Sequence, residues 1–243
     1  SLLGHVTFDG VTDAPPFEGF TVGSGNRDFI VRDTTGLVIR AIDHSAGGQL
    51  HILGSSDNTK IVACTLNWFD PDAGVVELVD SSVSGRLRQE GGSLHTTNVT
   101  VGGNFETSSS AVRTIAFRTT VTGDCNWNGP RSWFGYSAAR SFNFGGSNAK
   151  VVLVGNNIIG SSIDGVNVNG NNNTVGIYNC KVISVNSTIG EECIQIIGSN
   201  SVQILNNYLQ ITQYDENLYY NSGEVTYILK VEGTTDVLFA NNI

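Results

Sequence analysis

The sequence predicts an all-β chain folded as a single-stranded, right-handed parallel β-helix. Gly accounts for 29 of the 243 residues, and both Gly and the abundant Asn disfavour helix interiors. Short runs of alternating apolar and polar residues are separated by Gly and Asn turns, which is typical of strands with one buried face. One such run recurs along the C-terminal half, and repeats of about 20–50 residues indicate solenoid architectures.

The recurring run has apolar residues at its first and third positions, Asn at its fifth and an apolar residue at its eighth. Its copies begin at Val152, Val175, Val202 and Val237, and a second alternating run precedes each copy. In a β-helix the equivalent residues of successive coils lie about 4.8 Å apart. The side chains that we expect to point inward are Val152, Val154, Val175, Ile177, Val202 and Ile204.

The fixed Asn of each copy predicts a ladder. Asn156, Asn179, Asn206 and Asn241 would stack at one turn, each amide bonding the next. A β-sandwich is the alternative fold, but it does not require an Asn at a fixed position.

The domain organisation follows from the repeat. Residues 37–243 are expected to form one β-helix, and residues 1–36, which include Ala14-Pro15-Pro16, a segment leading into it. The last copy stops in mid-coil at Ile243. A bare coil end exposes unpaired backbone, so we expect a β-helix truncated at its C-terminal end, with the natural chain continuing.

Composition excludes several functions. With 13 Lys and Arg against 22 Asp and Glu, the net charge of −9 argues against nucleic-acid and anionic membrane partners. No apolar stretch is long enough for membrane insertion. The four cysteines, Cys64, Cys125, Cys180 and Cys193, form no zinc motif and fit either buried thiols or two disulfides. Motifs for nucleotide cofactors are absent, so neither metal nor cofactor is expected.

Aligning the predicted coils places four residues in one exposed column: Arg140, Asp164, Glu192 and Tyr227, with Glu191 beside it. Paired carboxylates near a cation suit general acid–base catalysis. The separation of such a pair distinguishes retaining from inverting glycosidases. Acidic residues on the exposed turns of an acidic protein are the alternative interpretation.

Two aromatic-rich insertions, residues 125–140 and 213–222, flank this column. Trp133 and Tyr219 would form its walls, where aromatic faces suit the apolar face of a sugar ring. Alternatively, these aromatic side chains cover the coil or pack against a neighbouring subunit.

The residues around this column resemble a known family. Ser162-Ile163-Asp164-Gly165, followed one coil later by Gly190-Glu191-Glu192-Cys193-Ile194, is similar to the Asn-Thr-Asp-Gly and Asp-Asp-Cys-Ile motifs of polygalacturonases. The resemblance implies that Asp164, Glu191 and Glu192 hold that family's catalytic acidic positions. The sequence departs from the family in having Glu for Asp in the second motif, and Ser222-Gly223 where the family has His-Gly.

More broadly, the chain resembles pectin-lyase-like β-helices, which include phage tailspikes. This resemblance implies an extracellular or virion-surface protein that recognises polysaccharide, with glycoside hydrolase activity left open. A non-catalytic fibre, decoration or adhesin shaft, and a secreted polygalacturonase-like glycosidase, are the alternatives. Exposed apolar side chains on a weakly charged surface predict a homo-trimer or a larger assembly.

Overall fold

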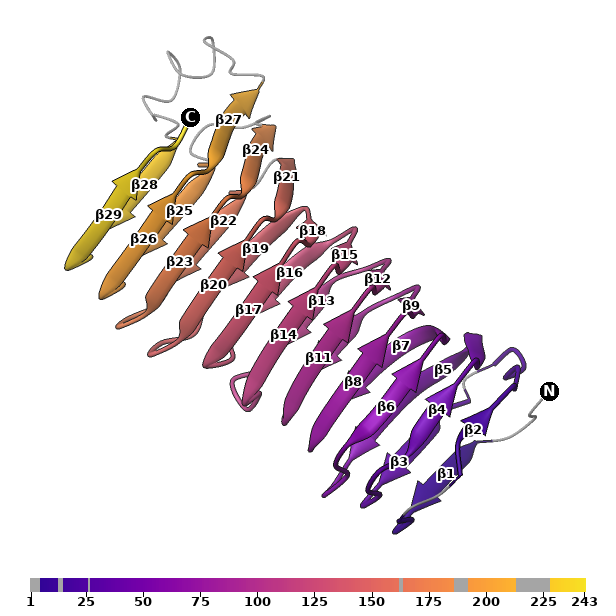
Figure 1. Cartoon of the computed structure of the whole chain (residues 1–243). Coiled ribbons are helices and arrows are strands. Elements are labelled where there is room, and N and C mark those ends of the chain that lie inside the picture. Colours follow the sequence, from indigo (N-terminus) through magenta and orange to yellow (C-terminus); the bar gives the residue numbers. More distant parts are fainter. Residues whose placement is uncertain (1–4, 13–14, 26, 162–163, 186–191, 213–227) are drawn as a thin grey trace. The chain divides into compact units, whose positions relative to one another are not determined.

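The computed structural model describes residues 5–12, 15–25, 27–161, 164–185, 192–212 and 228–243. The chain divides into two compact units, Ser1–Gly123 and Asp124–Ile243. In each unit, short parallel strands stack as a β-solenoid, as the sequence predicts (Figure 1). None of the described segments forms a helix with the length and apolarity of a membrane span.

The strands of the first unit are short and are separated by tight turns. They are β1 (Val6–Asp9), β2 (Phe17–Glu18), β3 (Phe29–Arg32), β4 (Val38–Arg40), β5 (Asp43–Leu53), β6 (Thr59–Val62), β7 (Thr65–Pro71), β8 (Val75–Val79), β9 (Ser82–Val83), β10 (Leu87–Gln89), β11 (Ser93–Thr97), β12 (Thr100–Val101), β13 (Phe105–Thr107), β14 (Arg113–Phe117) and β15 (Thr120–Val121).

The strands of the second unit follow the same plan. They are β16 (Asp124–Trp127), β17 (Arg131–Gly135), β18 (Ala138–Ala139), β19 (Ser141–Phe144), β20 (Lys150–Val154), β21 (Asn157–Ser161), β22 (Val166–Asn169), β23 (Thr174–Tyr178), β24 (Lys181–Val185), β25 (Ile194–Ile197), β26 (Ser201–Leu205), β27 (Tyr208–Thr212), β28 (Leu229–Glu232) and β29 (Asp236–Ala240).

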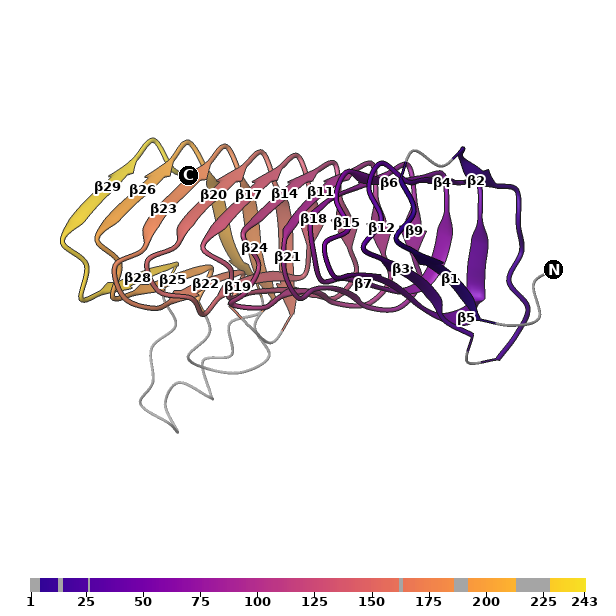
Figure 2. The ribbon, with the colours of Figure 1, turned by 90° about the horizontal axis from the view of Figure 1, so that it is seen from below.

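Successive strands of the second unit belong in turn to three parallel ladders. The first ladder is β16–β19–β22–β25–β28 and carries the predicted column. The second is β17–β20–β23–β26–β29, whose strands lie side by side in Figure 2. The third is β18–β21–β24–β27.

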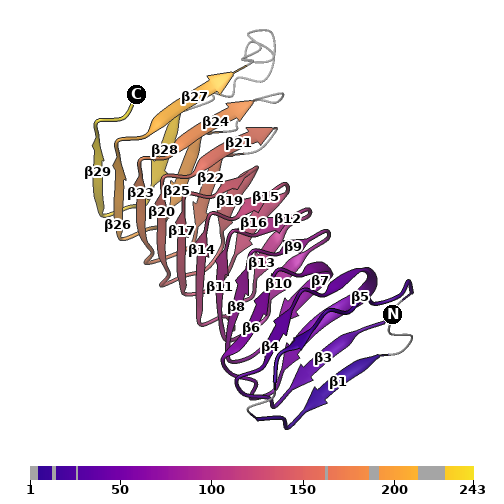
Figure 3. The ribbon, with the colours of Figure 1, turned by 45° about the vertical axis from the view of Figure 1, so that its right-hand side comes forward.

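The first unit has the corresponding ladders, and its stacking begins within residues 1–36. There β1 pairs with β3, and β3 pairs with β5, all in parallel (Figure 3). Strand β2 likewise pairs with β4. The segment expected to lead into the helix therefore contributes strands to the same ladders as the residues after it.

The predicted inward face is confirmed for four side chains and wrong for two. Val175, Ile177, Val202 and Ile204 are buried. Strand β20, however, is shifted by one residue from the expected alignment, because Val151 pairs with Val175. Its buried side chains are consequently Val151 and Leu153, while Val152 and Val154 are only half-buried. A one-residue shift exchanges the two faces of a strand.

The same shift corrects the predicted Asn stack. Asn179, Asn206 and Asn241 do occupy equivalent turn positions and adopt a left-handed backbone, with φ of 52°, 59° and 55°. The equivalent residue of the preceding coil is Gly155, with φ of 64°. Asn156 lies one position further along and is buried, so the prediction that it stacks with the other three is wrong.

Side-chain hydrogen bonds between coils are made by the buried residue that follows the left-handed turn residue, as Asn207 follows Asn206. The Asn207 Oδ1 accepts a bond from the backbone N of Cys180 at 2.8 Å, and its Nδ2 donates to the carbonyl of Ile177 at 3.0 Å. The Nδ2 also donates to Asn242 Oδ1 at 2.9 Å. Asn156 bonds to the backbone of Ser137 and Phe134 in the same way. These amides satisfy backbone groups that the turn leaves unpaired.

We expect Asn207→Ala to lower the free energy of unfolding by about 2–5 kcal/mol, because two buried backbone groups lose their partners. Asn206→Gly is the matched control. It lies at the exposed turn position, where Gly adopts the left-handed backbone without strain, and should change stability by less than about 1 kcal/mol. Urea unfolding of both variants measures the difference. Equal losses would contradict the assigned register.

Aromatic side chains fill the start of the second unit. Trp127 and Phe134 are buried, with ring centroids 4.3 Å apart, and Trp127 also lies 6.3 Å from Phe142. Residues 125–140 were expected to form an insertion, but they form the regular strands β16, β17 and β18 of one coil. Trp127 and Phe134, two aromatic residues of this segment, therefore belong to the core.

All four cysteines of the chain are buried free thiols. Burial raises the pKa of Cys64, Cys125, Cys180 and Cys193 above the usual thiol value. The sequence leaves open whether the cysteines are buried thiols or two disulfides, and the structure has thiols. Their raised pKa makes them poor nucleophiles.

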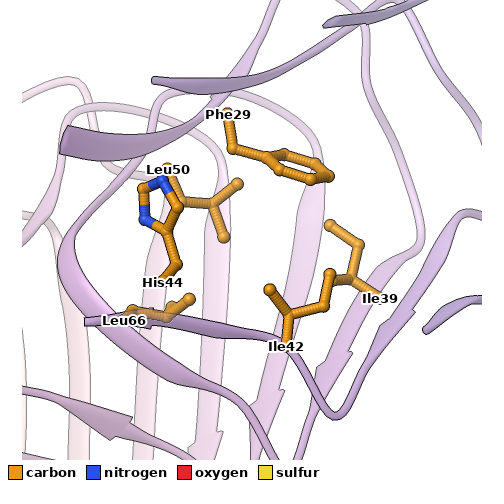
Figure 4. A pocket seen from close by; sticks show the side chains of 6 residues that line it. All are labelled: Phe29, Ile39, Ile42, His44, Leu50 and Leu66. Carbon is orange, nitrogen blue, oxygen red and sulfur yellow. The ribbon is translucent and has the colours of Figure 1, made fainter. Parts of the chain in front are cut away.

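In the first unit, a small apolar cavity lies beside a buried histidine where β5 changes register. Its lining side chains, shown in Figure 4, are Phe29, Ile39, Ile42, His44, Leu50 and Leu66. The His44 Nε2 lies 2.9 Å from the carbonyl oxygen of Arg27. A Cβ at Gly47 would lie 2.5 Å from the same Nε2, so only glycine leaves room for the ring.

Burial lowers the pKa of His44 below its usual 6.5, although the Arg27 carbonyl, Asp28 and Asp43 act in the opposite direction. The unfolded chain therefore binds this proton more tightly than the folded chain. We expect the free energy of unfolding to fall as the pH drops below about 6.5. His44→Gln should flatten this dependence in chemical unfolding between pH 7 and 5. An unchanged slope would show that other groups cause it.

Candidate functional site

The register of the first ladder aligns three residues of the predicted column. Phe142 pairs with Val166, and Val166 pairs with Ile194. Arg140, Asp164 and Glu192 each lie two residues before these partners and so occupy equivalent positions on successive coils. Glu191, Tyr219 and Tyr227, which the sequence also assigns to this site, lie outside the described residues.

Asp164 and Glu192 make direct contact between coils. The Asp164 Oδ1 accepts a bond from the backbone N of Glu192 at 2.6 Å, and its Oδ2 accepts one from Asn167 Nδ2 at 3.1 Å. The Asp164 carboxyl also acts on the Glu192 side chain, through a hydrogen bond and through its charge. Together they form a carboxyl pair, here called the Asp164–Glu192 pair.

The environment of Glu192 favours its protonated form. Its side chain is almost wholly buried, with 2% relative exposure. Burial, followed by the hydrogen bond and the negative charge of Asp164, raises the pKa of Glu192 to about 7. Lys230 and the hydrogen bond from Gln195, whose Nε2 lies 3.2 Å from Glu192 Oε2, act in the opposite direction. Near neutral pH the pair can therefore hold one proton and one negative charge.

Sequence reasoning missed the amide residues of this site. Asn167 and Gln195 pair with each other on adjacent strands, and Lys230 is the next residue in that row. A signal was present, because each acid precedes its amide by the same spacing, Asp164-x-x-Asn167 and Glu192-x-x-Gln195. On a parallel ladder, that spacing places the amide beside the carboxyl group.

Arg140 has a different partner. Its Nε donates to Asp124 Oδ1 at 2.8 Å, and Ser141 Oγ donates to the same oxygen at 2.8 Å. Hydrogen bonds from Arg140 and Ser141 lower the pKa of Asp124 despite its burial. The positive charge of Arg140 is thus directed to Asp124 rather than to the carboxyl pair.

Trp133 does not join this site. It lies on β17, in the second ladder, where it pairs with Val152. A Cβ at Gly135 would lie 2.4 Å from its ring, so the indole packs over that glycine on its own strand. The structure therefore gives no support to Trp133 as a wall of the column.

A carboxyl pair that holds a single proton contains both an acid and a base. Such pairs can activate a water molecule with one group and protonate a leaving group with the other. Among the described residues, no three His, Cys, Asp or Glu side chains lie together as metal ligands would. The pair itself is suited to proton transfer.

Comparison with protein-family models, curated proteins and solved structures yields no match to this chain. The resemblance to polygalacturonases rests on the motifs around Asp164 and Glu192 and is compatible with the parallel β-solenoid fold.

Proposed function

We propose that the protein binds a polysaccharide and hydrolyses a glycosidic bond with the Asp164–Glu192 pair. The observation that carries the proposal is the hydrogen bond from the Glu192 backbone N to Asp164 Oδ1, which joins two acidic residues of adjacent coils, together with the pKa of Glu192, which is raised to about 7. A group with that pKa is available both to give and to take a proton near neutral pH.

In the proposed reaction, Glu192 gives its proton to the glycosidic oxygen as the bond from that oxygen to the anomeric carbon breaks. Water then adds to the anomeric carbon from the same face, where the pair lies, and gives a proton to the Asp164 carboxylate. The products are a new reducing end and a free alcohol, and the pair again holds one proton. Asn167 and Gln195 hold the two carboxyl groups in place through their amide groups.

The proposal extends to the family and setting of the protein. We propose a pectin-lyase-like β-helix, which agrees with the stacked strands and the acidic motifs. Such a protein would act at the virion surface or outside the cell. It would meet its polysaccharide as a homo-trimer or in a larger assembly. The motifs support the family, and the setting follows from the family alone.

A second candidate is a non-catalytic shaft. It is favoured by the near-complete burial of Glu192 and by the engagement of both Asp164 oxygens, which cap the turn through the Glu192 backbone N and Asn167. In that case the pair joins successive coils, and polysaccharide is not cleaved.

One experiment separates the two. The purified chain is incubated with a panel of bacterial and plant polysaccharides, and both binding and new reducing ends are measured. Cleavage of a panel member supports the hydrolase. Binding without cleavage, or no binding at all, leaves the shaft.

A further inference from the structure

The first unit carries a second polar and aromatic face, on the outer side of β7, β10 and β13. Inward-pointing Phe69, Leu87 and Phe105 are buried and aligned. The outward residues between them form two short rows, which we call the Trp68 face. The rows consist of Trp68 and Arg86, and of Asp70, Arg88 and Glu106.

Trp68 is unusual for its exposure. It pairs with Gln49 on β5 and is 41% exposed, although a large aromatic side chain gains stability from burial. A Cβ at Gly85 would lie 2.3 Å from its indole ring, so the neighbouring coil leaves this space for the ring. The Arg86 guanidinium carbon lies 5.6 Å from the ring centroid. The result is a supported indole that still offers apolar surface to solvent.

The charged groups beside the indole make only long ion pairs, and some of their atoms lack a hydrogen-bond partner. Arg86 lies between two carboxylates, 4.0 Å from Asp70 and 3.9 Å from Glu106, which are long contacts for ion pairs. Two buried atoms, Asp70 Oδ1 and Arg86 Nε, have no hydrogen-bond partner. Burial raises the pKa of Asp70, against the opposing effect of Arg86. Both atoms are enclosed, so a ligand at the surface would meet the other carboxylate oxygen of Asp70 and the outer nitrogens of Arg86, which pair with each other only at 4.0 Å.

The charges of the face are nearly balanced. Arg86 and Arg88 are offset by Asp70, Glu106 and Glu90, the last 2.7 Å from Arg88 Nε. A polyanion would gain no net attraction there. A sugar hydroxyl suits the face better, because it donates to a carboxylate and accepts from a guanidinium at once. The C–H face of a pyranose ring matches the exposed indole.

We propose that the Trp68 face binds a pyranose ring of a neutral saccharide, stacked on Trp68 and hydrogen-bonded by Asp70, Arg86 and Glu106. This inference shares with the proposed function only the class of ligand. It assigns a binding site in the first unit that works without the Asp164–Glu192 pair.

The test is affinity electrophoresis in gels that contain dextran, galactomannan or arabinoxylan, with polygalacturonate as the polyanion. The wild-type chain should be retarded by at least one neutral polysaccharide, and Trp68→Ala should weaken that binding about tenfold or more. Arg86→Gln should weaken it as well. The same saccharide should protect the wild-type chain from iodide quenching of tryptophan fluorescence, and this protection should be absent in Trp68→Ala.

Tyr208→Ala is the matched control, because Tyr208 is 43% exposed and lies 5.9 Å below the Lys181 ammonium. It should bind as the wild-type chain does. Glu192→Gln should also retain binding, so that failure of the hydrolase leaves this inference standing. Equal binding by Trp68→Ala, preference for polygalacturonate, or no retardation by any neutral polysaccharide would overturn it. So would self-association in light scattering that depends on Trp68.

Discussion

Glu192→Gln should slow polysaccharide cleavage about 10²–10⁴-fold, the range for loss of general acid–base catalysis. The amide keeps the size of the side chain but cannot give up a proton at neutral pH. Asp164→Asn should have a similar effect, because the partner base is then lost. Since the two groups act together, the double variant should be little slower than either single variant. Reducing-end assays on a polysaccharide that the wild-type chain cleaves measure all three.

The pH dependence gives this prediction a second readout. Wild-type cleavage should decline above about pH 7, where Glu192 loses its proton. The free energy of unfolding should depend on pH through the same group. Because its pKa in the folded chain lies above the usual 4.5, Glu192 contributes stability at low pH that is lost as the pH rises from 4.5 to about 7. Glu192→Gln should remove that loss and remain folded.

Glu232→Gln is the control, because Glu232 is an exposed carboxylate on β28 that also lies near Lys230, 3.5 Å from its ammonium. It should leave cleavage unchanged. Full activity in both Glu192→Gln and Asp164→Asn would assign the pair to the structural joining of coils and refute the proposed mechanism.

Trp127→Ala should lower the free energy of unfolding by about 3–5 kcal/mol, the range for truncating a large buried aromatic residue. Trp127 is 1% exposed. Its ring contacts Phe134 edge-on at 4.3 Å and lies 6.0 Å from Phe144. The cavity left by the indole cannot collapse easily, because backbone pairing holds β16 against β19.

Trp68→Ala provides the contrast for that measurement. Its indole is 41% exposed and rests on the coil at Gly85, so urea unfolding should show a smaller loss, of about 1–2 kcal/mol. Similar losses in the two variants would contradict the placement of Trp127 in the core. A small loss in Trp68→Ala also ensures that any binding defect of this variant reflects the ligand contact.

Much of the candidate site could be predicted from spacing along the chain. In a parallel stack, residues at the same offset from aligned apolar pairs occupy one column, and this placed Arg140, Asp164 and Glu192 together. The charge partners could not be predicted in the same way. Arg140 pairs with Asp124 on the preceding coil. A side chain in such a stack has neighbours on the coils before and after it, and the spacing of the sequence does not tell which of them it will contact.

The Trp68 face escaped prediction for a related reason. Trp68 lies on β7 and Arg86 directly precedes β10, two weakly repetitive strands whose alignment becomes evident only through the pairing of Phe69 with Leu87. Two residues 18 positions apart in the chain then lie side by side. Their contact depends on Gly85, which leaves room for the indole.

The sequence by itself determined that this chain forms stacked parallel strands, because alternating apolar residues and Gly or Asn turns recur with the period of a coil. It also determined the inward faces of β23 and β26, because in each strand the inward valine and isoleucine are separated by a residue with little or no apolar side chain. In β20 the run Val151-Val152-Leu153-Val154 offers two apolar faces. Only pairing with β23 decided between them, because a shift of one residue costs such a run little hydrophobic burial and the ladder hydrogen bonds select the register.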